Sequence, residues 1–333
     1  MVLLDIRNLT IEIETPQGLV KAVDKFNLRL NAGEVRGLVG ESGSGKSLVA
    51  ETIVGIAKDT WHVTADRMMF DNIDLLSLSS TERRRIMGND IAMVFQEPSS
   101  CLDPAQKIGA QLQEGMPNRP ASGKGWQHWQ WRRKQAIELL HRVGIREPKR
   151  IMNAYPFELS EGVCQKVMIA MAIANQPKLL IADEPTNAME ASNHAQILRL
   201  LERVNTLSDT TILLISNDLT TFAKLTDSLT VMYCGQAVES GKREQVLTQP
   251  RHPYTAALLH MMPDLDGSLP HKSRLNILPG AIPPLQSLPI GCRLGPRCPN
   301  AQRKCIITPP LAIYKGQRYY CHFPLNMPEE KIK

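Results

Sequence analysis

The segment Gly40-Glu41-Ser42-Gly43-Ser44-Gly45-Lys46-Ser47 constrains the fold of this chain more than any other feature. It matches the pattern GxxxxGK[ST] and stands between a short apolar stretch, 34–39, and a stretch with helical character, 46–56. A strand, a glycine-rich turn and a helix in that order present backbone N–H groups and a helix N-terminus to phosphates. The segment therefore predicts a P-loop that binds a nucleotide.

Each residue type in this loop has a chemical reason to be there. The glycines let the backbone N–H groups curl around the phosphates, Lys46 reaches the β- and γ-phosphates, and Ser47 is a ligand for Mg²⁺. We predict that ATP and Mg²⁺ bind to Gly40, Ser42, Gly43, Gly45, Lys46 and Ser47.

The remaining apolar pattern predicts an α/β fold. Residues 3–14 and 20–30 alternate apolar and polar side chains, which is typical of antiparallel strands joined by the turn at 16–18. Continuous apolar runs at 91–95, 179–182 and 211–216 are typical of strands buried on both faces of a parallel sheet. Strand signals are missing between 96 and 160, where helical spacing predicts a helical insert.

The run Leu179-Leu180-Ile181-Ala182-Asp183-Glu184 supplies the carboxylates that a nucleotide-hydrolysing site needs. An apolar strand that ends in two acids brings Asp183 toward Mg²⁺ and Glu184 beside the attacking water. We therefore predict Asp183 as a magnesium ligand and Glu184 as the catalytic base.

Composition and hydrophobic patterning restrict the expected cellular location of the chain. The chain has 333 residues, 43% of them hydrophobic and 22% charged, and a formal net charge of +6. Its apolar runs are far shorter than the roughly 20 residues of a membrane-spanning helix. The first ten residues have no secretory signal pattern, so we expect a cytosolic chain.

Four of the seven cysteines, Cys292, Cys298, Cys305 and Cys321, gather in an irregular, proline-rich segment near the C-terminus. Four thiolates suit a tetrahedral zinc ion or a [4Fe-4S] cluster. The intervals of five, six and fifteen residues fit neither the short pairs of zinc ribbons nor the ferredoxin pattern, so geometry leaves the metal open. Thiols without a metal are the alternative.

Further motifs resemble those of ABC ATPases. Leu159-Ser160-Glu161-Gly162 is similar to the signature motif, Gln96 to the Q-loop glutamine, 185–190 to the D-loop and 216–219 to the H-loop. The motifs stand in family order over about residues 1–245. The resemblance implies an ABC cassette with a RecA-like parallel-sheet core, an N-terminal antiparallel β subdomain and a helical subdomain over about 97–175.

The motif His252-Pro253-Tyr254 extends this resemblance to the oligopeptide and dipeptide importer ATPases, which carry a C-terminal extension. We expect the extension over 246–333, beyond a cassette at 1–245. In these relatives the tail holds a [4Fe-4S] cluster, so the resemblance favours iron and sulfur over zinc at the four cysteines.

The same resemblance implies partners. Two cassettes close head to tail, so that Ser160 and Gly162 of each would bind the ATP held by the other. Gln96 would contact Mg²⁺ and report nucleotide state to transmembrane permease subunits. We expect a peripheral ATPase on the cytoplasmic face of the inner membrane that powers uptake of oligopeptides or antimicrobial peptides, with a periplasmic binding protein as an indirect partner and no nucleic acid.

Two positions depart from the family pattern. Asn217 stands where active cassettes have a histidine at the γ-phosphate, and Glu161 stands where the signature has its first glycine. Asparagine donates a hydrogen bond but carries no proton or charge, so we expect Asn217 to support catalysis weakly. A heterodimer with an intact second ATPase would separate the two defects. The alternatives are a nucleotide-sensing subunit with little hydrolysis and a soluble ABC ATPase outside transport.

Three tryptophans, Trp126, Trp129 and Trp131, lie beside Lys124 and 132–134, which are basic. Aromatic and basic side chains together are typical of membrane surfaces and of nucleic-acid platforms. Within the expected helical subdomain we favour the membrane side. A solvated basic helix with buried tryptophans is the alternative.

Overall fold

The computed structural model describes residues 1–116, 125–187, 191–261 and 278–327. The chain forms two compact units, one made of Met1–Ser77 with Leu214–Lys333 and the other of Leu78–Leu213. The division falls within strand β9 (Thr211–Ser216), which is buried along its whole length. The two units are described one at a time.

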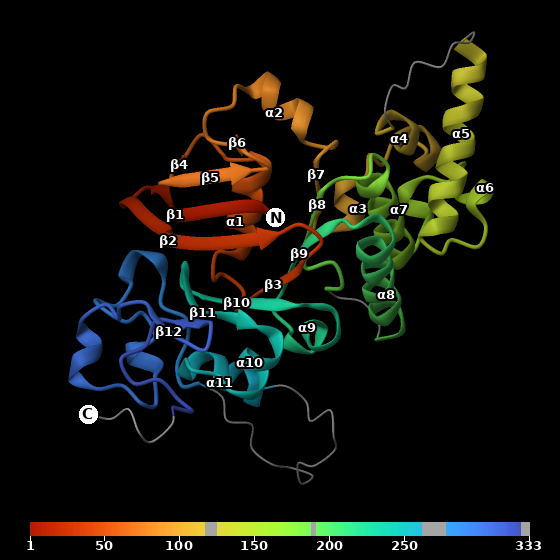
Figure 1. Ribbon diagram of the computed structural model, residues 1–333. Helices are drawn as coiled ribbons and strands as arrows, with labels where there is room; N and C mark the ends of the chain where they lie inside the picture. The colour runs from red at the N-terminus through yellow and green to blue at the C-terminus, as the bar shows by residue number, and fades with distance from the viewer. Residues whose placement is uncertain (117–124, 188–190, 262–277, 328–333) are drawn as a thin grey trace. The chain divides into compact units, whose positions relative to one another are not determined.

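The first unit begins with an antiparallel sheet whose strands run in the order β2-β1-β5-β6, while β4 also pairs with β1 (Figure 1). Alternating side chains of the two long strands, among them Leu4, Ile6 and Phe26, are fully buried on one face. The strands are β1 (Val2–Thr15), β2 (Gly18–Asn31), β4 (Trp61–Thr64), β5 (Arg67–Phe70) and β6 (Ile73–Asp74).

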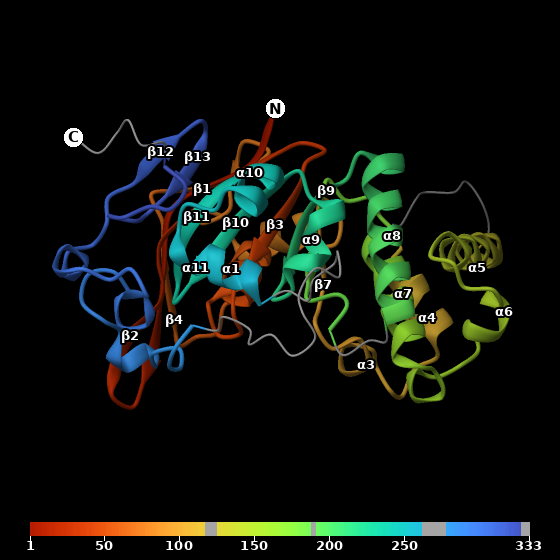
Figure 2. The same cartoon turned by 90° about the horizontal axis from the view of Figure 1, so that it is seen from below.

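A second sheet of the first unit joins the P-loop strand to the C-terminal extension. Strand β10 pairs in parallel with β3 and antiparallel with β11, and the hairpin of β12 and β13 continues the sheet beyond β11 (Figure 2). The elements are β3 (Val35–Val39), α1 (Lys46–Val54), α9 (Leu219–Leu225), β10 (Ser228–Tyr233), β11 (Gln236–Lys242), α10 (Arg243–Thr248), α11 (Pro253–His260), β12 (Ala312–Tyr314), β13 (Gln317–Tyr319) and the 3-10 turns η2 (Leu285–Ser287), η3 (Gly295–Arg297) and η4 (Arg303–Ile306).

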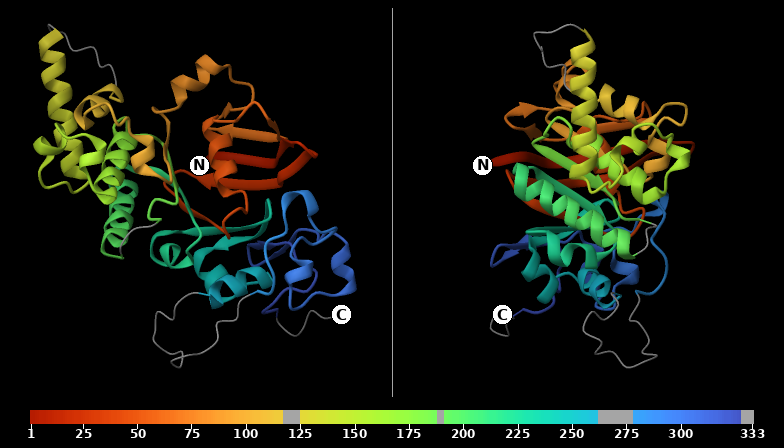
Figure 3. Two further views of the ribbon diagram at one scale, coloured as in Figure 1. Left: turned by 180° about the vertical axis from the view of Figure 1, so that it is seen from behind. Right: turned by 90° about the vertical axis from the view of Figure 1, so that its right-hand side faces the viewer.

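The second unit is mainly helical, with two parallel strands, β7 and β8 (Figure 3). Its longest helices include α5, whose apolar residues Ala136, Leu139 and Leu140 are buried and which packs against α4 and α7. The elements are α2 (Ser80–Ile86), β7 (Ile91–Val94), α3 (Pro98–Cys101), α4 (Ile108–Glu114), α5 (Gly125–Arg142), α6 (Pro148–Ile151), η1 (Pro156–Glu158), α7 (Glu161–Ile173), β8 (Leu179–Asp183) and α8 (Ala191–Ser208).

The predicted α/β class is confirmed, and the local signals lie close to the observed elements. The helix predicted at 46–56 is observed as α1, which ends at Val54, and Gly55, with a left-handed φ of 80°, is its C-cap. Buried strands occur at each of the three continuous apolar runs. In the described parts of the chain, no helix has both the length and the apolar character needed to cross a membrane.

Candidate functional site

The P-loop lies between β3 and α1, and its glycines are required by its shape. A Cβ at Gly40 would overlap the carbonyl oxygen of Met232, so the backbone there has no room for a side chain. Gly43 and Gly45 have φ angles of 80° and 101°, a region that other residues rarely adopt. These glycines therefore allow the tight curve that a phosphate-binding loop needs.

The side chain of Lys46 folds back onto the P-loop. Lys46 is buried, and its ammonium group donates hydrogen bonds to the carbonyl oxygens of Gly40, at 2.8 Å, and Glu41, at 3.0 Å. Close by in the chain, the buried hydroxyl of Ser44 has no hydrogen-bond partner. An unpaired buried donor in this loop fits an anionic ligand.

Helix α1 presents an uncapped N-terminus at the end of the loop. Its N-cap residue is Gly45, no side chain caps its first turn, and that turn carries no acidic residue. Ser47, partly exposed, follows Lys46 in this turn. A positive helix end, an ammonium group and a hydroxyl together suit the triphosphate and the magnesium ion of Mg·ATP.

The second unit holds the carboxylates at the end of β8, whose residues are all buried. Asp183 ends the strand, and Glu184 follows it with a positive φ of 43°. Gln96 Nε2 and Asn187 Nδ2 each donate to the same oxygen of Glu184, both at 3.0 Å. The structure thus brings Gln96 and Glu184 together, and two amides orient the carboxylate.

The hydrogen bond from Asn187 to Glu184 was not predicted from the sequence, although Asn187 lies in the segment similar to the D-loop. It lies three positions after Glu184, and its backbone N–H also donates to the Glu184 carbonyl oxygen at 3.1 Å. The sequence feature that could have indicated this contact is the short turn that follows an acidic residue at the end of a strand, because asparagine is common in such turns. Residues 188–190 of the same segment lie outside the described residues.

The signature segment starts helix α7 with its N-terminus uncovered. Ser160 is the N-cap residue, it is exposed, and its side chain makes no capping hydrogen bond. Glu161 is exposed in the first turn, where a carboxylate stabilises the helix dipole. A Cβ at Gly162 would stand 3.4 Å from the side chain of Asn193 on α8, in ordinary contact.

Asn217 lies directly after β9 and is exposed. The turn that carries it is held by the next residue, because the Asp218 N–H donates to the Ser216 hydroxyl at 3.1 Å. This local bond orients the strand end without using the Asn217 side chain. Its amide is therefore presented to solvent at the end of a buried strand.

The four cysteines of the extension line one small cavity, together with the imidazoles of His252 and His322. None of the seven cysteines forms a disulfide. Burial raises the pKa of the thiols of Cys292 and Cys298 and raises the pKa of Cys321 to about 12, with the other three thiols adding to the effect on Cys321. Burial therefore favours the neutral thiol form of Cys292, Cys298 and Cys321.

No metal-binding arrangement is formed at these cysteines. Among the described residues, no three His, Cys, Asp or Glu side chains are close enough together to hold a metal ion. The predicted [4Fe-4S] cluster or zinc ion is thus unsupported by the geometry, although the shared cavity places all four thiols around one space.

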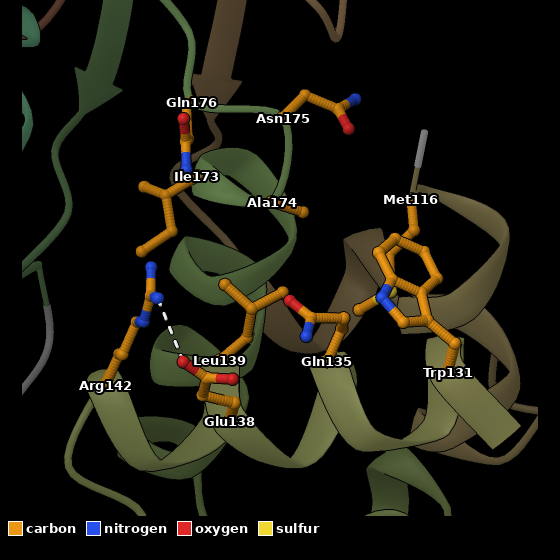
Figure 4. Close-up of a pocket in the computed structure, with 10 residues that line it drawn as sticks. All are labelled: Met116, Trp131, Gln135, Glu138, Leu139, Arg142, Ile173, Ala174, Asn175 and Gln176. Atoms are coloured by element: carbon orange, nitrogen blue, oxygen red, sulfur yellow. Dashed lines mark hydrogen bonds and ion pairs between the residues drawn. The ribbon is translucent and has the colours of Figure 1, made fainter. Parts of the chain in front are cut away.

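Two tryptophans of the stretch at 124–134, Trp129 and Trp131, lie in different environments. Trp129 is 55% exposed and lies under the guanidinium of Arg133, at 5.5 Å from the ring centre. Trp131 instead lines a cavity of about 160 Å³ between α5 and the end of α7, where Glu138 and Arg142 pair (Figure 4). Lys124 and the side chain of Trp126 lie outside the described residues.

Two family models match the chain. A model described as ABC transporter matches residues 23–187, and one described as oligopeptide/dipeptide transporter, C-terminal region, matches residues 238–305. The second match includes three of the four clustered cysteines and residues 246–305 of the expected extension at 246–333.

Similar proteins cover the whole chain. The peptide transport system ATP-binding protein SapD of Salmonella typhimurium is 60% identical over 99% of this chain and all of its own length. SapD of Haemophilus influenzae is 51% identical over all of this chain and 95% of its own length. The dipeptide transport ATP-binding protein DppD of Escherichia coli strain K12 is 39% identical, with 98% of both chains covered.

Solved structures agree with these matches. A bacterial ABC transporter cassette solved as a dimer is similar with a TM-score of 0.64 and 27% identity, covering 72% of this chain and 99% of its own. A cassette in a post-hydrolysis state, bound to ADP and Pi, has a TM-score of 0.63 at 26% identity and covers 72% of this chain and 99% of its own. The chain is an ABC-type ATPase, and it belongs to the ABC transporter family, in the group whose cassette carries the oligopeptide/dipeptide transporter C-terminal region.

Proposed function

We propose that this chain is the ATP-binding subunit of a peptide transporter and that Mg·ATP hydrolysis in its cassette powers peptide uptake. The likeness to peptide and dipeptide transport proteins over nearly the full length, extension included, carries the proposal. The cassette does not choose the peptide. Oligopeptides are the substrates to test first, because SapD and DppD are named for peptide and dipeptide transport. Antimicrobial peptides are the second class to test.

The residues divide the work of the site. Lys46 and the P-loop N–H groups would bind the phosphates, and Ser47, Gln96 and Asp183 would hold Mg²⁺, which would supply positive charge to neutralise the phosphates. Glu184, oriented by Gln96 and Asn187, accepts the proton of the attacking water. Asn217 donates a hydrogen bond at the γ-phosphate, with no charge to add.

The partners follow from how cassettes work in pairs. Ser160, Gly162 and the uncapped N-terminus of α7 would bind the ATP of a second cassette. Transmembrane permease subunits would hold the pair at the cytoplasmic face of the inner membrane, with a periplasmic binding protein delivering peptide. In a homodimer both departures, Asn217 and Glu161, would act on the same ATP, so we propose a heterodimer with a related ATPase.

Purification of the tagged chain from detergent-solubilised membranes tests the transport proposal. Permease subunits and a second ATPase should copurify, and the complex in vesicles should accumulate labelled peptide only with ATP. A Glu202→Gln complex, changed at an exposed position on α8, serves as a matched control. Copurification with ribosomes or DNA and without permeases would instead support an ABC ATPase outside transport.

Asn217→His tests the heterodimer. In the complex with the second ATPase we expect turnover to rise, by about tenfold to a hundredfold, because an imidazole at the γ-phosphate restores a donor that can carry charge. The isolated chain should stay near zero with either residue. An isolated chain that hydrolyses ATP at about 1 s⁻¹ or faster would contradict both the heterodimer and the weakened site.

A nucleotide-sensing subunit is the second candidate, and the exposed Asn217 and Glu161 favour it. In that case the complex would bind ATP at this P-loop, and Asn217→His would leave turnover unchanged. The same measurement therefore separates the two functions.

For the extension we propose a [4Fe-4S] cluster held by Cys292, Cys298, Cys305 and Cys321. All four thiols line one cavity, which motivates the proposal, and binding of a cluster would require them to move closer together and to lose their protons. Protein purified without oxygen should be brown and contain about four irons per chain. A colourless preparation with one zinc ion per chain would decide for zinc.

A further inference from the structure

Two arginines flank two of the clustered cysteines, and one of them binds a residue of the P-loop directly. Arg293 follows Cys292 and Arg297 precedes Cys298, and the side chains of both arginines are almost fully buried. Buried guanidinium groups need specific acceptors, because they cannot lose their charge. The acceptors include Glu41 of the P-loop, Cys234 in the turn after β10 and Asp24 on β2.

Arg297 binds the carboxylate of Glu41, the second residue of the P-loop, with two hydrogen bonds. Its Nη1 lies 2.9 Å from Oε2 and its Nη2 lies 3.2 Å from Oε1, a planar fork that lysine cannot reproduce. Its Nε donates to the carbonyl oxygen of Pro279 at 3.1 Å, and its Nη1 donates to the Tyr233 hydroxyl at 3.3 Å. The Glu41 carboxylate raises the pKa of Arg297 further above its usual range.

Glu41 is held through its backbone as well. Its N–H donates to the hydroxyl of Tyr254 at 2.8 Å, and its carbonyl oxygen accepts from Lys46 at 3.0 Å. Tyr254 belongs to the His-Pro-Tyr segment, where His252 caps α11. The extension therefore contacts both the side chain and the backbone of one P-loop residue.

Arg293 makes a second, parallel connection. It donates to Asp24 at 2.7 Å and to the carbonyl oxygen of Cys234. The next residue, Gly235, donates its N–H to the carbonyl oxygen of Ser44 in the P-loop at 2.8 Å. Both cysteine-flanking arginines thus lead to the P-loop within one or two contacts.

We propose that Arg297 is a positioning residue for the nucleotide site, and that through it the packing of the four-cysteine segment sets the affinity for Mg·ATP. A carboxylate in a phosphate-binding loop repels the phosphates, and Arg297 neutralises it. Because Arg297 ends η3 and is covalently joined to Cys298, a change in the position of Cys298 moves the guanidinium. The proposal concerns ATP binding and is independent of what is transported.

Arg297→Met is the first test. It leaves the Glu41 carboxylate unpaired beside the phosphates, so we expect the Kd for Mg·ATP, measured by calorimetry on the full chain, to rise about tenfold. Arg303 is exposed and begins η4, the turn that contains Cys305, so Arg303→Met is the matched control and should leave the Kd unchanged. An unchanged Kd in Arg297→Met would overturn the proposal.

A double-mutant cycle separates positioning from a general loss of structure. In a Glu41→Gln background, Arg297→Met should have almost no further effect on the Kd, because no carboxylate remains to neutralise. Arg297→Lys should recover part of the affinity, since it keeps the charge and loses the fork. If Arg297→Met weakens binding equally in both backgrounds, the residue acts through folding alone and the proposal is wrong.

A thiol readout tests the connection in the opposite direction. If the cysteine segment affects ATP affinity, bound ATP must stabilise the segment by the same factor. In the full chain prepared without bound metal, we expect Mg·ATP to slow alkylation of Cys292 and Cys298 several-fold, and to have no such effect in Arg297→Met. Exposed Cys101 is the internal reference. Equal alkylation rates with and without Mg·ATP in the parent chain would contradict the coupling.

Discussion

Lys46→Ala should abolish Mg·ATP binding at millimolar nucleotide. The ammonium group lies inside the P-loop, bonded to two of its carbonyl oxygens, so it is both the charge that meets the phosphates and a support for the loop. The substitution removes a charge-assisted hydrogen bond to a phosphate and the two hydrogen bonds that hold the loop. We therefore expect the Kd for Mg·ATP to rise by more than about a hundredfold. Calorimetry on the purified chain measures this directly.

Lys58→Ala is the matched control, because this lysine is exposed in the same unit of the chain. It should bind Mg·ATP like the parent chain. Thermal unfolding of both variants without nucleotide separates a lost ligand contact from a lost fold. Equal ATP affinity in Lys46→Ala and the parent chain would show that the P-loop assignment is wrong.

Glu184→Gln should stop turnover while ATP stays bound. Glutamine has nearly the shape of glutamate, and its carbonyl oxygen can still accept hydrogen bonds from Gln96 and Asn187. It cannot accept the proton of the attacking water, so the rate in the complex with the partner ATPase should fall by about 10²- to 10⁴-fold.

Nucleotide retention distinguishes this effect from the previous one. After gel filtration, Glu184→Gln should retain ATP, whereas Lys46→Ala should not. Glu202→Gln, on an exposed face of α8, should keep the turnover of the parent complex. Parent-like turnover in Glu184→Gln would remove this residue as the base.

Local sequence patterns are enough to predict the fold class and the nucleotide-binding loop of this protein. A glycine-rich loop between a strand and a helix has one common folded form, because its φ angles and its backbone donors are set by neighbouring residues. Buried strands are visible in sequence for a similar reason, since both of their faces must be apolar. Hence the α/β class, the P-loop and the strand that ends in Asp183 could all be predicted from residues close together in the chain.

Contacts between distant residues were decided only by the tertiary structure. Arg297 and Glu41 are 256 positions apart, and nothing in GxxxxGK[ST] requires an acid at its second position or names its partner. The same holds for Gln96 and Glu184, which are 88 positions apart, and whose hydrogen bond the motifs did not specify. Such pairs form only when strands and turns that are distant in the sequence pack together. The sequence near a side chain does not indicate which distant group it will contact. The motifs therefore indicated which residues bind nucleotide, and folding decided which residues hold them in place.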